Sequence, residues 1–173
     1  TPIGNSSMPY TGIFDGAGKT VSGLYFNNNE DYVGLFGYVD GGVVKDVGVV
    51  DSYFKGLSRV GGVVGYADDA TLTGVYNTGS VSGSSEVGGV VGRAFLGELT
   101  DVYNTGSVSK NTGSEGQYFG GVVGFAGRTT LTDVYNTGSV SGSIYVGGVA
   151  GYTNNEITIT DVYNTGSISK TTD

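Results

Sequence analysis

Tyr76-Asn77-Thr78-Gly79-Ser80 is the stretch of sequence that decides this fold. The same five residues recur further along the chain, starting at Tyr103, Tyr135 and Tyr163. A second string, Gly-Gly-Val-Val/Ala-Gly, ends at Gly65, Gly92, Gly124 and Gly151, and residues 33–37 are an earlier version of it. Repeats of 27–32 residues indicate a solenoid whose units stack. The spacing predicts a divergent N-terminal capping segment, residues 1–31, and five units: 32–59, 60–86, 87–118, 119–145 and 146–173.

Each unit carries three short apolar stretches, which in the second unit are residues 60–66, 71–77 and 80–82. Val, Tyr and Thr favour strands, whereas Gly, Asn and Asp mark corners. A unit of 27 residues is too short for a propeller blade, which needs about 40–45. The pattern predicts an all-β protein, a three-sided parallel β-helix of about five coils of 27–32 residues. Equivalent residues should then form interior ladders, Leu72 with Leu99, Leu131 and Ile159, and Val75 with Val102, Val134 and Val162.

Composition and charge exclude several classes of protein. The 173 residues include 34 Gly but only 2 Pro, and 38% are hydrophobic, which fits neither a disordered linker nor collagen. The net charge is −8 and no basic cluster occurs, so nucleic acid is not an expected partner. No apolar run approaches the ~20 residues of a membrane span, so no membrane insertion is expected. Since His and Cys are absent, we expect no enzyme, no catalytic residue, no metal and no cofactor.

A column of aspartates is the strongest polar feature, and its members are Asp46, Asp101, Asp133 and Asp161, interrupted at Gly74. One interpretation is a calcium-binding or acid–base row. The favoured interpretation is structural: each Asp bends the chain and accepts hydrogen bonds from nearby backbone amides, without a metal. The pair Asp68 and Asp69 is either half of a cation site or, as we expect, a solvated turn, because calcium takes 6–8 oxygen ligands.

Two aromatic columns are also predicted. The first contains Tyr76, Tyr103, Tyr135 and Tyr163; the second contains Tyr38, Tyr66, Phe125 and Tyr152, with Arg93 filling the gap. Aromatic surfaces can hold sugar rings, but stacking between coils is the favoured explanation. Glycines inside strands, at Gly62, Gly89, Gly121 and Gly148, indicate that another wall of the helix comes too close for a Cβ.

Two further features have a binding interpretation and a simpler one. Threonine pairs at 71/73, 130/132 and 158/160 could form an ice-binding grid, but Glu98 and Lys45 interrupt the row and plain β-propensity explains it. The third unit is five residues longer than its neighbours, through residues 109–118. That insertion is either a binding face or, as favoured, a tolerated surface change.

Residues 34–38, 61–66 and 75–83 resemble the core of the GLUG motif, and residues 14–25 resemble the lead-in that often precedes the first such motif. The resemblance implies a bacterial cell-surface or secreted protein, such as the non-catalytic parts of immunoglobulin A peptidases and large adhesins. In those proteins the repeat is a stalk or a presenting surface. The peptidase zinc motif, His-Glu-x-x-His, is not carried over, because the chain has no His.

The sequence therefore predicts a non-catalytic structural or adhesive solenoid module, extracellular or on the bacterial cell surface. It would act as a spacer or as a binding surface for a host protein or a glycan. The alternative is a carbohydrate-active or carbohydrate-binding β-helix that uses the Asp and Tyr columns. No helix or charged segment follows Ile168, so we expect the last coil to present unpaired backbone groups. Either the parent chain continues there, or this end self-associates end to end.

Overall fold

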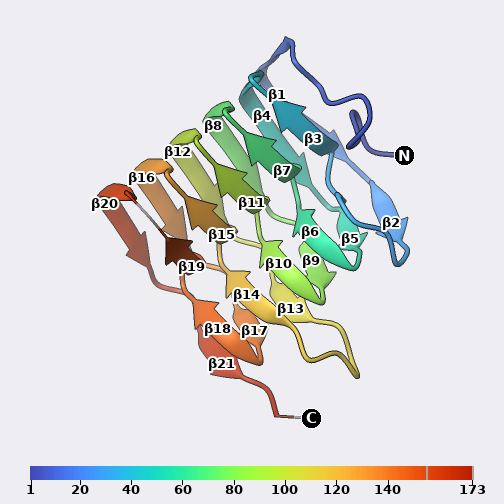
Figure 1. Ribbon diagram of the computed structural model, residues 1–173, viewed down its shortest axis with the longest axis vertical. Helices are drawn as coiled ribbons and strands as arrows, with labels where there is room; N and C mark the ends of the chain where they lie inside the picture. The colour runs from blue at the N-terminus through green and yellow to red at the C-terminus, as the bar shows by residue number, and fades with distance from the viewer. Residues whose placement is uncertain (155, 173) are drawn as a thin grey trace.

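The computed structural model describes residues 1–154 and 156–172, which form 21 strands and, within those ranges, no helix. The strands stack as successive coils of a parallel β-helix (Figure 1). Every strand pair among them is parallel, as predicted. None of the described segments is a helix that could span a membrane.

The coils build four parallel sheets. Sheet I contains β1 (Ile13–Ser22), β4 (Val43–Val50), β8 (Thr71–Asn77), β12 (Glu98–Asn104), β16 (Thr130–Asn136) and β20 (Thr158–Asn164). Sheet II contains β2 (Tyr25–Asn27), β5 (Tyr53–Lys55), β9 (Ser80–Gly83), β13 (Val108–Lys110), β17 (Val140–Gly142) and β21 (Ile168–Lys170). Sheet III contains β6 (Ser58–Gly61), β10 (Ser85–Gly88), β14 (Gln117–Gly120) and β18 (Ile144–Gly147). Sheet IV contains β3 (Phe36–Asp40), β7 (Val64–Asp68), β11 (Val91–Phe95), β15 (Val123–Gly127) and β19 (Ala150–Asn154).

A complete coil thus has four strands, one more than the three apolar stretches expected. The difference lies in residues 60–66, which divide into the end of β6 and the start of β7 around Gly62 and Val63. The backbone bends at these two residues. Val63 is fully buried, so the bend itself is part of the core.

The interior is made of the predicted ladders. Leu72, Leu99 and Leu131 pair in register across sheet I, and none of them is exposed. Val75, Val102 and Val134 are equally buried. Because the same residue type recurs in each coil, each side chain packs on similar side chains in the coils above and below it. The hydrophobic core is filled by this stacking of equivalent residues.

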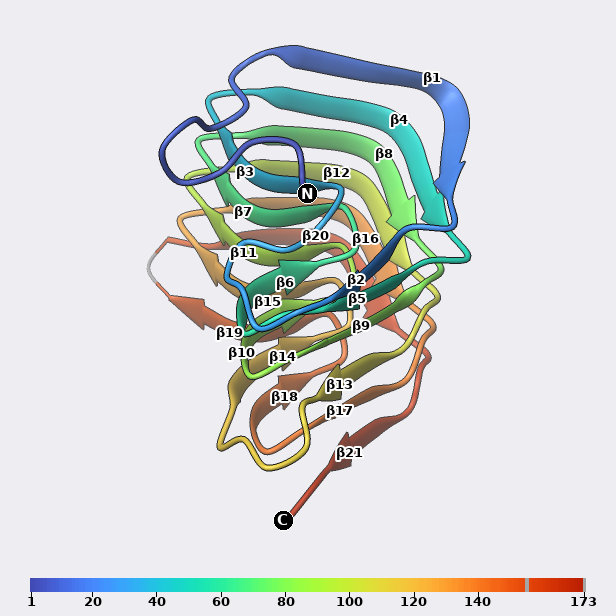
Figure 2. The ribbon, with the colours of Figure 1, turned by 90° about the vertical axis from the view of Figure 1, so that its right-hand side faces the viewer.

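The strands of sheet I bend at the middle, and Figure 2 shows them turning a corner of the solenoid. At each bend one residue has left-handed backbone geometry, with φ between 51° and 63°: Ala17, Asp46, Gly74, Asp101, Asp133 and Asp161. Asp and Gly tolerate this region better than most residues. The aspartate column therefore marks a corner of the coil, as expected from its place between apolar residues.

Residues 1–31 add a rung of their own. Strands β1 and β2 pair with β4 and β5, and Ile3 and Tyr10 bridge to Phe36 and Val39 of sheet IV. The ring of Phe26 stacks on that of Phe54, with centroids 5.5 Å apart. The divergent segment thus continues the ladders of the repeats toward the N-terminal end.

The last coil is less covered than the others. Ile159 and Ile168 occupy the register positions of Leu131 and Val140. Their side chains are 50% and 48% exposed, compared with 0% and 1% for those two counterparts. The difference arises because a coil buries its inward residues only where another coil lies on both sides of it.

Candidate functional site

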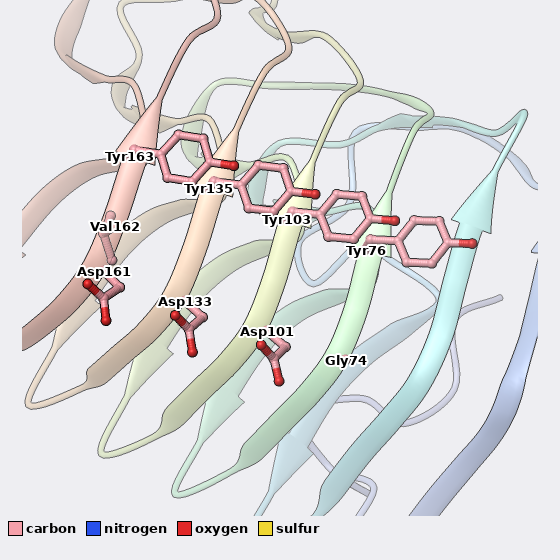
Figure 3. Close-up of a pocket in the computed structure, with 9 residues that line it drawn as sticks. All are labelled: Gly74, Tyr76, Asp101, Tyr103, Asp133, Tyr135, Asp161, Val162 and Tyr163. Carbon is pink, nitrogen blue, oxygen red and sulfur yellow. The ribbon is translucent and has the colours of Figure 1, made fainter.

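A groove of about 820 Å³ runs along the outer face of sheet I. Its lining residues are Gly74, Tyr76, Asp101, Tyr103, Asp133, Tyr135, Asp161, Val162 and Tyr163 (Figure 3). Strands β12, β16 and β20 each contribute an aspartate and, two residues later, a tyrosine. The two columns that the sequence predicted separately are therefore two walls of one groove.

The tyrosine wall is a regular ladder. Ring centroids of Tyr76, Tyr103, Tyr135 and Tyr163 lie 4.7, 4.9 and 5.0 Å apart in turn, with ring planes within 3° of parallel. This spacing is the distance between neighbouring strands, so the ladder is set by the coil rise. The predicted stacking is confirmed. Burial first, and then the charges of neighbouring phenolates, raise the pKa of Tyr103 and Tyr135.

The ladder has a defined first ring. Each hydroxyl points along the axis toward the preceding coil (Figure 3). The ring of Tyr76 consequently covers Gly48, where a Cβ would lie 2.5 Å from the Tyr76 hydroxyl oxygen. A glycine is needed at this position because the side chain of the next coil occupies the space.

The aspartate wall differs from the expectation in its hydrogen bonding. Asp101, Asp133 and Asp161 are exposed, and within the described part of the chain no backbone amide donates to their carboxylates. The prediction that backbone amides donate hydrogen bonds to these carboxylates was therefore wrong. The bend is held by left-handed φ angles of 54°, 52° and 51°, which turn the side chains outward into the groove. The carboxylates form a row at the coil spacing, with Gly74 as a gap before Asp46.

A second ladder lies inside the coil, and sequence reasoning missed it. Its members are Asn77, Asn104, Asn136 and Asn164. Asn104 is fully buried and its four hydrogen bonds are all made. Its Nδ2 donates to Asn136 Oδ1 at 2.9 Å and to the Gly106 carbonyl at 2.7 Å. Its Oδ1 accepts from Asn77 Nδ2 at 3.0 Å and from the Gly106 amide at 3.2 Å.

The asparagine ladder is also the wall that the strand glycines must avoid. A Cβ at Gly62 would lie 2.5 Å from Asn77 Oδ1, and Gly89, Gly121 and Gly148 face the next asparagines in the same way. The signal was present in the sequence, since one Asn and one such Gly recur in each of the last four units. From the sequence, the Asn in Tyr-Asn-Thr-Gly-Ser is predicted only to mark a corner, and its stacking inside the coil is not predicted.

The second aromatic column also forms, with a cation inside it. Arg93 pairs in register with Tyr66 and Phe125, and its guanidinium carbon lies 5.5 and 4.4 Å from their ring centroids. Glu86, 7% exposed, accepts from Arg93 at 2.7 Å and contacts Arg59 at 3.2 Å. Arg93 thus replaces an aromatic ring by stacking its planar group between two of them.

The two residues of the Asp68 and Asp69 pair differ in environment. Asp69 is an exposed corner residue with a φ of 47°, as expected for a turn. Asp68 is half-buried, and its Oδ2 accepts hydrogen bonds from the hydroxyls of Tyr38 and Tyr66, both at 3.3 Å. A solvated turn was thus the wrong expectation for Asp68, because the tyrosines of two coils reach it. Burial first, and then the Asp68 charge, raise the pKa of Tyr38 to about 12.

This environment predicts a specific alkaline titration. Burial and the Asp68 charge also raise the pKa of Tyr66. Because both pKa values are higher in the folded state, the stabilisation from these two hydroxyls is complete below about pH 10 and is lost as the pH rises through the raised pKa values, the one for Tyr38 being about 12. Asp68→Asn should lower both pKa values, measured by phenolate absorbance. The control Asp69→Asn should leave them unchanged; equal shifts in both variants would contradict the assignment.

The insertion lines a smaller pocket, of about 390 Å³, together with residues of β5 and β9. The insertion is tied down by Asn111, whose Nδ2 donates to the Gly56 carbonyl two coils away at 2.8 Å. Glu98 pairs in register with Thr71 and Thr130, so it interrupts the threonine row as predicted. Among the described residues, no group of three or more Asp or Glu side chains is arranged to hold a metal ion.

Comparison with known proteins identifies the repeat. The family model described as "The GLUG motif" matches residues 56–82 and 83–109, two successive coils. Halomucin of Haloquadratum walsbyi (strain DSM 16790 / HBSQ001) is 38% identical over 88 residues, which are 48% of this chain and 1% of halomucin. The chain therefore spans only a very small part of that relative. No solved structure matches the chain. The chain therefore carries two successive GLUG motifs, over residues 56–82 and 83–109.

Proposed function

We propose that this chain is a non-catalytic structural module of a secreted or cell-surface protein, where it acts as a rigid spacer with an adhesive outer face. The observation that carries the proposal is the continuity of the four sheets. Backbone hydrogen bonds join each strand to the next coil, and the tyrosine and asparagine ladders run through the last four coils, so these coils cannot hinge independently. The match to a small part of halomucin supports a place within a much longer protein.

The absence of a catalytic role is part of the proposal. Its support is the repetition of the polar residues: Asp101, Asp133 and Asp161 have the same surroundings in three coils. A catalytic group instead needs a single position at which different groups converge. A second candidate, carbohydrate binding by the groove, is favoured by the tyrosine wall, because aromatic surfaces can pack against sugar rings. Host proteins and glycans are the partners we propose for an adhesive face.

Duplicating one coil tests the spacer. Inserting a second copy of residues 60–86 after residue 86 should lengthen the particle by about 5 Å, because it adds one strand to each sheet. Small-angle X-ray scattering measures the length, and the melting temperature should not fall. A scrambled version of the same 27 residues is the matched control, which should form a loop and destabilise the protein. Equal behaviour of the two insertions would contradict the spacer.

The same scattering series tests end-to-end association, which we propose for the exposed last coil. Ile159 and Ile168 present apolar surface beside the unpaired edges of β20 and β21. If this end self-associates, the particle mass should rise with concentration and Ile159→Lys should abolish the rise. A constant monomer mass at all concentrations would remove this part of the proposal.

A further inference from the structure

We propose that the groove on sheet I binds a linear oligoamine, with three protonated amines on Asp101, Asp133 and Asp161. The ligand class is a chain of amines separated by three-carbon spacers. This binding goes beyond the spacer function and does not depend on it, since a rigid rod with an empty groove would still be a spacer.

Charge is the first observation. The three aspartates occupy consecutive coils with the same backbone conformation, so their carboxylates point the same way (Figure 3). None of the groove-lining residues is a Lys or Arg. The described ion pairs of Lys45, Arg59 and Arg93 involve Asp15, Asp31 and Glu86. Three like charges in one groove repel one another and concentrate negative potential there, which favours a multivalent cation.

Spacing selects among cations. Equivalent atoms of neighbouring coils lie 4.7–5.0 Å apart, as the tyrosine rings show. In an extended N–C–C–C–N unit the two nitrogens lie about 5 Å apart, given C–N and C–C bonds of about 1.5 Å. Successive amines can therefore face successive carboxylates. Same-face side chains of an extended peptide lie about 6.6–6.8 Å apart, so a lysine-bearing strand would lose register within two residues.

The tyrosine wall suits the remainder of such a ligand. The rings of Tyr103 and Tyr135 line the groove, and methylene groups of the ligand can pack against them. The row of hydroxyl oxygens along this wall can accept hydrogen bonds from ammonium groups. A neutral sugar chain could use the rings but would leave the three carboxylates without a counter-charge.

The test uses bis(3-aminopropyl)amine, which has three amines joined by three-carbon spacers. Isothermal calorimetry at low salt should show one molecule bound per chain. Asp133→Asn removes the central charge and keeps a residue that tolerates the left-handed backbone, so affinity should fall at least ten-fold. The control is Asp46→Asn, in the same column but beyond the Gly74 gap, which should change affinity less than two-fold. Melting temperatures of both variants verify that they fold.

Comparing the affinities of other ligands shows whether the groove prefers a three-carbon oligoamine. Diethylenetriamine, with two-carbon spacers, should bind at least five-fold more weakly than bis(3-aminopropyl)amine. Binding that is equal for the two triamines, or unaffected by Asp133→Asn, would overturn the proposal. Tighter binding of another ligand would also overturn it. Trilysine would indicate a polypeptide partner, a neutral oligosaccharide would support the carbohydrate candidate, and calcium alone would indicate a metal site.

Discussion

Replacing Gly89 by alanine should lower the free energy of unfolding by about 3 kcal/mol, near the upper end of what overpacking of a core usually costs. The new Cβ would lie 2.5 Å from Asn104 Nδ2 and would press on the backbone carbonyl of Gly121 in the next coil. Neither neighbour can move freely. Asn104 is fixed by four hydrogen bonds, and the Gly121 carbonyl belongs to the stacked backbone. The coil spacing would have to change locally.

The measurement is denaturant unfolding, and the matched control is Gly113→Ala in the insertion. Gly113 has a φ of 75° and nothing within 4 Å of its would-be Cβ. Alanine there should cost only the left-handed conformation, about 1–2 kcal/mol. If Gly89→Ala costs no more than Gly113→Ala, crowding by the asparagine ladder is not the reason for glycine at this position.

Repetition explains why much of this fold is predictable from the sequence. Leu72, Leu99 and Leu131 recur at one phase of the repeat, and stacking in register is the arrangement that buries all three. The division of residues 60–66 into two strands was not predictable from apolar pattern. Residues on both sides of the bend at Gly62 are buried, so the pattern shows no interruption there.

The candidate site was predictable only in parts. The sequence placed Asp133 and Tyr135 in two separate columns, but their joining into one groove depends on the bend that a left-handed Asp133 imposes on β16. Backbone dihedral angles are not visible in a composition pattern, and Asp is compatible with both turn and left-handed geometry. The contact of Asp68 with Tyr38 was missed for another reason, because the repeat places Tyr38 beside Tyr66 but does not show that Asp68 reaches both hydroxyls.

Asn104 and Asn136, each fully buried with four hydrogen bonds, should be the polar side chains whose loss costs most, and Asn104 is the one to test. In Asn104→Leu, an apolar residue of similar size leaves the amide and the carbonyl of Gly106 without their buried partners. A buried polar group that loses its hydrogen bond costs about 1–3 kcal/mol, so the variant should lose about 4 kcal/mol of unfolding free energy. The neighbours Asn77 and Asn136 lose one bond each and keep those to Gly79 and Gly138.

The matched control is Asn164→Leu in the last coil. Asn164 makes the equivalent bonds to Gly166, at 2.9 and 3.2 Å, but it is only partly buried. Water can replace its partners there, so the loss should stay near 1 kcal/mol, measured by the same denaturant unfolding. Equal losses at both positions would mean that the ladder acts through local turn geometry, which both residues share. A larger loss at Asn104 means that it acts through buried hydrogen bonds along the axis, where every coil depends on the asparagine of the next.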